Sequence, residues 1–291
     1  MSSLALSLVL LSACFHSIWN FLLKGSTNRE VFTWWMLISI SVLLIPLGVI
    51  MFLQEPFSLI GLLFILGTIT LHILYYILLA RGYSKADLSI VYPIARGMSP
   101  ILVPIMGVFV LDEGVSFIGL IGISIIILGI GFVYWWGRIK EIINNPLQFL
   151  REPGLRYAVG TGIIIAIYSI WDKVGVSHMN PVMYMYSMTL GTAISMFPIV
   201  LRLHGLQSIQ AEWKLNRIRI LGAGTFDFLS YVLILTALTF SPISYIAPAR
   251  EIGIVLGVLL GSILLKEPFG KGRILGSSMI VLGITLVTLA N

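Results

Sequence analysis

The stretch VYPIAR at residues 91–96 lies inside a long apolar run, and IAPARE at residues 246–251 lies inside another. Each places an arginine, Arg96 or Arg250, where a membrane-spanning helix would bury it. A charge at the centre of a bilayer costs on the order of 3 kcal/mol, and less when it faces water or a partner. Two such residues in similar surroundings need a common explanation, which the rest of the sequence must supply.

The composition is typical of a helical membrane protein with several spans. Of 291 residues, 58% are hydrophobic and 10% are charged, whereas soluble domains carry roughly 25% charged residues. The apolar runs are long and continuous, which favours helices over the short alternating segments of a β-barrel. Basic cytoplasmic loops account for the net charge of +6, so we expect no nucleic-acid partner. The single cysteine, Cys14, excludes a disulfide within the chain.

Ten apolar segments are long enough to cross a membrane, because about 20 helical residues span the hydrocarbon core. Their approximate ranges are 3–23, 31–53, 58–80, 87–110, 115–136, 156–174, 180–202, 217–239, 243–265 and 271–290. The longest connection, 137–155, lies at the middle of the chain. We therefore expect two five-segment repeats, 1–136 and 156–291, joined by a linker at 137–155.

The two halves resemble each other. SIWN at 17–20 returns as SIWD at 169–172, and Arg96, Glu113 and the LGI of 128–130 return 154 residues later as Arg250, Glu267 and the LGI of 282–284. Ordered matches at nearly one offset indicate a duplication. Because five is an odd number, the second repeat must enter the membrane inverted, as in many secondary transporters. The predicted fold is an all-α membrane protein with ten transmembrane helices, arranged as two inverted five-helix repeats around a central cavity.

The positions of the basic residues predict the orientation. Apart from the two arginines inside segments, every Lys and Arg except Lys173 follows an odd-numbered segment. The positive-inside rule then puts these loops in the cytoplasm and both termini outside. We expect a multi-pass protein of the inner (plasma) membrane, surrounded by the lipid bilayer, as a monomer or homodimer.

Arg96 lies on a polar helix face that prolines interrupt. Its neighbours one turn away include Tyr92, Pro93, Ser99 and Pro100. Prolines free backbone carbonyls, which is tolerated where a helix lines a cavity. A guanidinium there suits a carboxylate or phosphate group.

Two interpretations of Arg96 stay open at this point. It could bind an anionic substrate, or it could form a structural ion pair with a buried carboxylate such as Asp227 or Glu251. The same choice applies to Arg250 and the adjacent Glu251. Glu251 and Asp227 are also candidates for proton coupling.

Other polar side chains within the segments are fewer. His16, Ser17 and Asn20 share one face of the first segment, where His16 could titrate near neutral pH or form hydrogen bonds between helices. For His72 we favour structural hydrogen bonding. Asp172 and Lys173 end the sixth segment, where we expect water to reach them.

The sequence contains no GxxxxGK, GxSxG or HExxH pattern, and its four histidines are not paired. We therefore expect no metal site, no cofactor and no enzyme activity.

Three stretches resemble EamA-type transporters of the drug/metabolite transporter (DMT) superfamily. They are HSIWNFLLKG (16–25), DLSIVYPIARGMSPILVPIMGVFVLDE (87–113) and ALTFSPISYIAPAREIGIVLGVLLGSILLKEP (237–268). The resemblance implies a secondary transporter with a central cavity between its halves. It also implies that Glu113 and Glu267 are structural or gate positions. The matching cavity positions, which we take as candidate substrate-binding residues, are His16, Trp19, Asn20, Tyr92, Arg96, Trp171, Asp172 and Arg250.

We predict a secondary transporter for a small polar metabolite that is anionic or zwitterionic, such as an amino acid, an organic acid or a phosphonate-like compound. Two cations favour such a substrate by charge complementarity. Proton coupling through Glu251, Asp227 or His16 is a hypothesis. The alternatives are a flippase for a lipid-linked anionic or sugar group and, with less support, an intramembrane enzyme.

Overall fold

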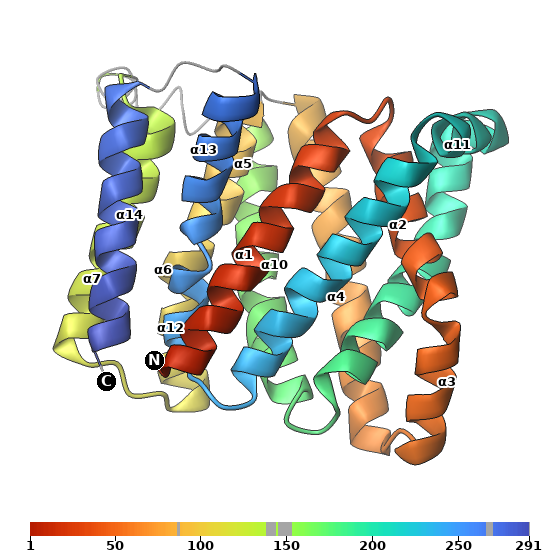
Figure 1. The fold of residues 1–291 in the computed structure, drawn as a ribbon, viewed down its shortest axis with the longest axis horizontal. Helices are drawn as coiled ribbons and strands as arrows, with labels where there is room; N and C mark the ends of the chain where they lie inside the picture. Colours follow the sequence, from red (N-terminus) through yellow and green to blue (C-terminus); the bar gives the residue numbers. More distant parts are fainter. Residues whose placement is uncertain (86–87, 138–143, 145–152, 266–269, 291) are drawn as a thin grey trace. The chain divides into compact units, whose positions relative to one another are not determined.

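The computed structural model describes residues 1–85, 88–137, 144, 153–265 and 270–290. These residues are almost entirely helical, and Figure 1 shows the arrangement of the helices. The helices are α1 Ser3–Lys24, α2 Arg29–Leu43, α3 Ile45–Gln54, α4 Leu59–Lys85, α5 Leu88–Gly97, α6 Ser99–Leu111, α7 Phe117–Trp135, α10 Pro153–Gly175, α11 Pro181–Leu238, α12 Ile243–Ala249, α13 Ile252–Leu265 and α14 Lys271–Leu289.

The predicted all-α membrane fold is confirmed. Within the described ranges, 7 helical stretches are long and apolar enough to span a membrane, or up to 8 if α2 and α3, which meet at 58°, form one span. The helix α11 runs over 58 residues but contains Gly205 in a non-helical conformation, with φ 71° and ψ 164°. Each part of α11 exceeds the about 20 residues that one span needs. The count of ten spans stays a prediction.

The helices form two compact units. Unit 1 comprises residues 1–13, 74–170 and 240–291, and unit 2 comprises residues 14–73 and 171–239. Each unit therefore takes segments from both predicted sequence repeats. The division of the sequence at 137–155 stays a prediction, and most of that linker lies outside the described residues.

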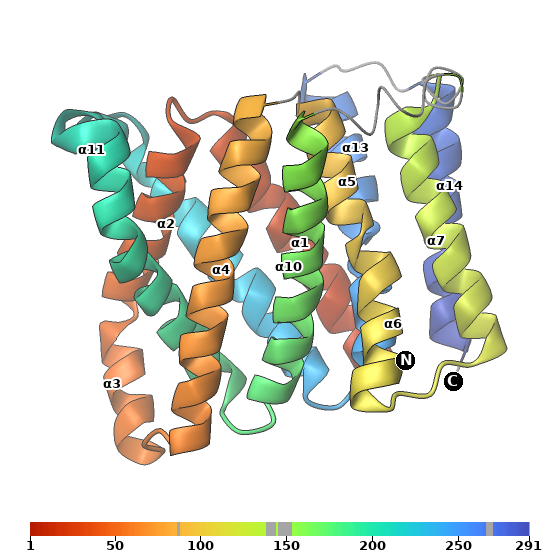
Figure 2. The same cartoon turned by 180° about the vertical axis from the view of Figure 1, so that it is seen from behind.

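Inside unit 1, the glycines of α7 and α14 reveal the inverted relationship of the repeats. A Cβ atom on Gly122 would lie 2.7 Å from the carbonyl oxygen of Gly283, and one on Gly129 would lie 2.7 Å from that of Gly276. With the offset of 154, Gly122 corresponds to Gly276 and Gly129 to Gly283. The contacts thus exchange equivalent positions and run antiparallel, as a two-fold relationship requires. Figures 1 and 2 show the two helices side by side.

One predicted span in each repeat is broken into two shorter helices, at nearly equivalent places. The helix α5 gives way to α6 at Met98, and α12 gives way to α13 at Arg250 and Glu251. Proline explains the weakness of these points, because it has no N–H to donate. Pro100 cannot bond to the carbonyl of Arg96 one turn earlier, and Pro248 cannot bond to that of Ser244. Both interruptions lie beside the buried arginines.

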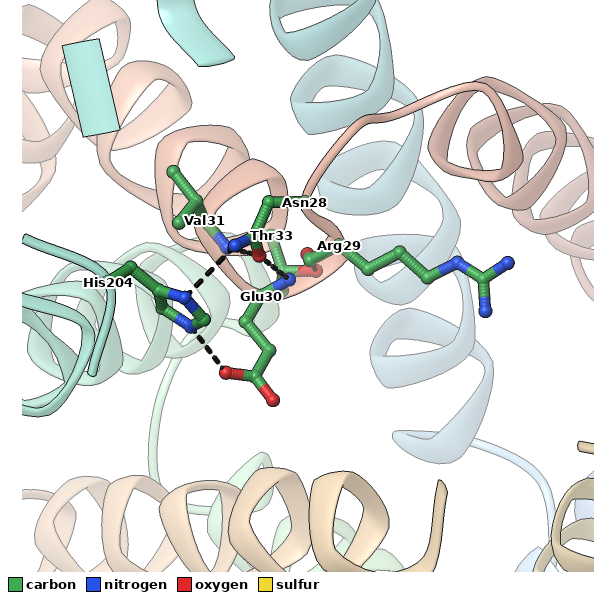
Figure 3. Close-up of polar contacts among 6 residues, drawn as sticks. All are labelled: Asn28, Arg29, Glu30, Val31, Thr33 and His204. Carbon is green, nitrogen blue, oxygen red and sulfur yellow. Dashed lines mark hydrogen bonds and ion pairs between the residues drawn. The ribbon is translucent and has the colours of Figure 1, made fainter. Parts of the chain in front are cut away.

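In unit 2, a small polar network fixes the start of α2 (Figure 3). The Asn28 side-chain oxygen accepts hydrogen bonds from the N–H groups of Glu30 and Val31, at 3.1 and 3.2 Å. The His204 ring lies 3.0 Å from the Asn28 amide through Nδ1 and 2.6 Å from the Glu30 carboxylate through Nε2. Arg29 extends away from this network. Asn28 thus caps α2 and anchors it to α11.

Buried Glu212 of α11 completes the anchor. Its two carboxylate oxygens accept hydrogen bonds from the backbone N–H groups of Thr27 and Asn28, at 3.3 and 2.9 Å, and one of them also accepts from the Asn216 amide at 2.7 Å. A charged acceptor supplies stronger hydrogen bonds than a neutral one. Glu212 therefore fixes the loop between α1 and α2 by hydrogen bonds to the backbone of that loop.

The glycine pairing generates a stability prediction. We expect Gly129→Ala to destabilise the protein by about 1–3 kcal/mol, because the added methyl group would meet the backbone of α14. Gly257→Ala is the matched control, since a Cβ atom there has no neighbour within 4 Å. Thermal unfolding of the purified variants in detergent measures the effect. Equal unfolding temperatures for the two variants would contradict the close packing of α7 and α14.

The cap of α2 generates a second prediction. We expect Asn28→Ala to cost about 1 kcal/mol of stability, because two N–H groups at the helix start lose their acceptor. Thr33→Ala serves as the control, since the Thr33 hydroxyl bonds to the Arg29 carbonyl within the same helix. The same unfolding measurement applies, and an Asn28→Ala variant as stable as Thr33→Ala would show that the cap contributes nothing.

Candidate functional site

Arg96 forms an ion pair with Glu251 inside unit 1. A guanidinium nitrogen of Arg96 lies 3.5 Å from Oε1 of Glu251. The side chain of Arg96 is 13% exposed and that of Glu251 is 2% exposed. Glu251 is one of the two carboxylates that the sequence offered as partners of Arg96. Whether Arg96 also contacts a substrate stays a prediction.

Arg250 belongs to the same cluster. It is half-buried and follows the last residue of α12, and it interacts electrostatically with Glu251. One carboxylate therefore serves two guanidinium groups. The second oxygen of Glu251, Oε2, is buried and has no hydrogen-bond partner among the described residues. A buried acceptor without a hydrogen-bond donor is uncommon in proteins and indicates a functional role or an absent partner.

The two arginines occupy equivalent places on their helices. Arg96 lies in the last turn of α5, and Arg250 is the C-cap of α12. The carbonyl end of a helix carries partial negative charge, so each position favours a cation. The duplication and the helix interruptions together explain why the chain holds two buried arginines.

Glu113 holds the start of the short helix that carries Arg250. Its carboxylate accepts hydrogen bonds from the N–H groups of Ile243 and Ser244, at 2.8 and 2.9 Å, and from the Ser244 hydroxyl at 2.6 Å. These are the donors that the start of a helix leaves unpaired. This arrangement fits the structural role that the resemblance implies for Glu113. Its counterpart Glu267 lies outside the described residues.

In unit 2, three predicted substrate-binding residues share one face of α1. The indole N–H of Trp19 donates to Nδ1 of His16 at 3.1 Å, and the Asn20 amide donates to the His16 carbonyl at 2.7 Å. The rings of His16 and Trp19 meet edge to face, with centroids 5.1 Å apart. All three side chains are half-buried. They form a polar and aromatic surface that is partly open.

Trp171 makes its contacts within unit 2. Its indole N–H donates to the Phe64 carbonyl at 2.9 Å, and its ring lies against Gly67, where an added Cβ would come within 2.3 Å of it. These contacts fix α10 against α4.

Asp172 is fully buried, so the expectation that water reaches it is wrong. Its Oδ1 accepts a hydrogen bond from the Tyr184 hydroxyl at 2.7 Å, and its Oδ2 accepts one from the Tyr231 hydroxyl at 2.5 Å. Neighbouring Lys173 donates to the carbonyl of Leu238. Sequence analysis missed both tyrosines, because they lie 12 and 59 residues from Asp172. No local pattern links residues at such distances along the chain.

The remaining candidates contribute less. Asp227 is half-buried on α11 and has an interaction partner. Tyr92 lies in α5, but its side chain is outside the described part of the structure. No group of three or more potential metal ligands occurs among the residues that the structure describes.

Comparison with known proteins identifies a family. A model described as "EamA-like transporter family" matches residues 3–135 and 152–289, which is one match for each half of the chain. A solved structure described as "Crystal structure of protein" has a TM-score of 0.75 and 15% sequence identity, and the match covers 99% of this chain and 98% of that one. That likeness concerns the fold. Comparison with curated protein sequences finds no match.

The charge balance of the arginine cluster generates a prediction. We expect Glu251→Gln to lower the stability by about 3–5 kcal/mol, because it removes the buried carboxylate that interacts with both guanidinium groups. Arg96→Gln and Arg250→Gln should each lower it less. Adding Arg96→Gln to Glu251→Gln should restore part of the loss. Thermal unfolding in detergent measures all four variants. A Glu251→Gln variant as stable as the unmodified protein would show that Glu251 does not neutralise the cluster.

Proposed function

Because the chain belongs to the EamA-like transporter family, and so is a multi-pass membrane transporter of the DMT superfamily, we propose that it is a secondary transporter for a small polar metabolite with an anionic group. Amino acids, organic acids and phosphonate-like compounds fit this description. The family consists of transporters, and we propose no enzyme activity for this member.

The observation that carries the proposal is the cluster of Arg96, Arg250 and Glu251. Both guanidinium groups lie close to the buried carboxylate of Glu251. A substrate with one carboxylate or phosphonate group would find two cationic partners in this cluster. Arginine suits this task, because its planar donors match two oxygens at once and its charge persists at any physiological pH.

Glu251 would control access to the arginines. While it is ionised, it occupies Arg96 in the manner of an internal anion. When it takes up a proton, its negative charge disappears and the substrate anion can replace it at the guanidinium group. Proton and anion would then bind together, which couples transport of the anion to transport of the proton. Asp227 remains the second predicted candidate for coupling.

The other predicted residues divide into two groups. We propose that His16, Trp19 and Asn20 contact the substrate, since their side chains are half-buried and include both ring and amide groups. Tyr92 keeps its predicted role as a substrate contact. The polar atoms of Trp171 and Asp172 form hydrogen bonds within the protein, so we place neither residue in the substrate site.

Transport would proceed by alternating access, in which one sequence repeat moves against the other around the bound substrate. We propose that the protein resides in the inner (plasma) membrane with both termini outside, as the basic loops indicate.

Flux measurements test this proposal. We expect reconstituted protein in liposomes to carry a radiolabelled member of a panel of amino acids, organic acids and phosphonates. Flux should fall at least tenfold in Arg96→Ala and in Arg250→Ala, which is the loss expected for about 1.4 kcal/mol of substrate binding. Arg217→Ala, at an exposed arginine of α11, should leave it unchanged.

Three outcomes would contradict the proposal. Flux that persists in both variants would remove the arginines from the substrate site. Movement of a labelled lipid without movement of any soluble anion would favour a flippase. Chemical conversion of a panel member without flux would favour an enzyme.

A further inference from the structure

A second buried charged cluster lies in unit 2, in addition to the arginine cluster. It contains Asp172 of α10, Tyr184 and Tyr231 of α11, and His72 of α4. Asp172 and Tyr184 are fully buried, and His72 and Tyr231 are each 8% exposed. The proposed substrate site does not use this cluster. An ionisable residue inside a membrane protein is costly and usually functional, so the cluster calls for an explanation.

The carboxylate of Asp172 accepts hydrogen bonds from the hydroxyls of Tyr184, on Oδ1, and Tyr231, on Oδ2, and from the side chain of Thr68. The His72 ring meets the Tyr231 ring edge to face, with centroids 6.2 Å apart, and interacts electrostatically with Asp172. Nδ1 of His72 lies 2.9 Å from the carbonyl oxygen of Thr68. Nδ1 also lies 3.2 Å from the Thr68 hydroxyl. It can therefore donate to the carbonyl when it carries a proton and accept from the hydroxyl when it does not.

Tyr184 has two acceptors within reach. Its hydroxyl lies 2.7 Å from Oδ1 of Asp172 and 3.5 Å from the carbonyl oxygen of Phe64. The Phe64 carbonyl also accepts from Trp171, but a carbonyl oxygen can accept two hydrogen bonds. The Phe64 carbonyl thus offers the Tyr184 hydroxyl an acceptor when Asp172 no longer accepts from it.

We propose that Asp172 is a reversible proton-binding site, with Tyr184 as the group that rearranges when the proton arrives. In the ionised state, both tyrosine hydroxyls donate to Asp172. When a proton binds Oδ1, the carboxyl group becomes a donor to the Tyr184 oxygen. The Tyr184 hydroxyl then turns its own proton to the Phe64 carbonyl. Every polar hydrogen of the pair keeps an acceptor in both states.

The surrounding charges make the site responsive. Asp172 faces His72 and the Thr68 hydroxyl on α4 and the hydroxyls of Tyr184 and Tyr231 on α11. Lys173, on the same helix as Asp172, donates to the Leu238 carbonyl. With His72 charged, an ionised Asp172 gives a neutral pair, and proton binding changes the net charge of the buried cluster by one. The inference rests on the proposed transport function, because a proton carried with the substrate is what such a site would serve.

Infrared difference spectroscopy tests the site without any substrate. The probe is the proton, titrated from about pH 5 to about pH 9, the range in which histidine and perturbed carboxyl groups change charge. We expect the purified protein to show a protonated-carboxyl band that varies with pH and disappears in Asp172→Asn. The band should persist in Glu251→Gln, which separates this site from the arginine cluster.

Conservative variants cover the case in which Asp172→Asn does not fold. Tyr184→Phe removes the rearranging hydroxyl and should move the midpoint of the band. Tyr186→Phe, at a buried tyrosine two residues along the same helix, should not. A carboxyl band that is absent, or a midpoint that is the same in Tyr184→Phe and Tyr186→Phe, would overturn the proposal.

Transport then separates this proposal from the proposed function. We expect Asp172→Asn to exchange the labelled substrate across liposomes without a pH gradient, but to accumulate less of it than the unmodified protein when a pH gradient is applied, with Glu251 still in place. Loss of both activities in a folded variant would indicate a structural role and contradict the inference. Absence of flux in the unmodified protein would contradict the proposed function, and the infrared result would still decide whether Asp172 binds a proton.

Discussion

The cost of holding charge inside hydrocarbon is the constraint on which this structure depends. A chain with 58% hydrophobic residues nevertheless buries Arg96 and Glu251 side by side and places Arg250 beside them. The ion pair offsets part of the cost of desolvating its members, and Glu251 interacts with both cations. Two guanidinium groups suit an anionic substrate, and the incomplete hydrogen bonding of Glu251 leaves a group that can release its partner.

The duplication of the sequence explains where the two arginines lie. Each repeat contributes one arginine at the carbonyl end of a short helix that a proline has weakened. The exchanged glycine contacts of α7 and α14 show the same inverted relationship in the packing of backbones. Glu113 then supports the start of α12 through its backbone N–H groups. The duplication therefore explains why each repeat has a broken helix and why an arginine lies at the break in each.

Much of this could be predicted from the sequence, because periodic hydrophobicity and repeated motifs are local signals. The helical membrane fold, the repeat and the conspicuous arginines are of that kind. The pairing of Arg96 with Glu251 is different, since the sequence offered both Asp227 and Glu251 and only the folded chain shows this contact. Asp172 was misjudged for a related reason: it lies near the end of a helix, which suggested contact with water. Tyr184 and Tyr231, from the two ends of the long helix α11, enclose it instead.

The central claim is that Glu251 acts as an internal anion that gives up Arg96 to the substrate when it becomes protonated. Proton uptake by the purified protein during anion binding, followed with a pH indicator in weakly buffered solution, tests this most directly. The account predicts uptake of about one proton per bound anion, by linkage between proton and ligand binding, and loss of that proton in Glu251→Gln. Anion binding without proton uptake, or the same uptake in both proteins, would contradict it.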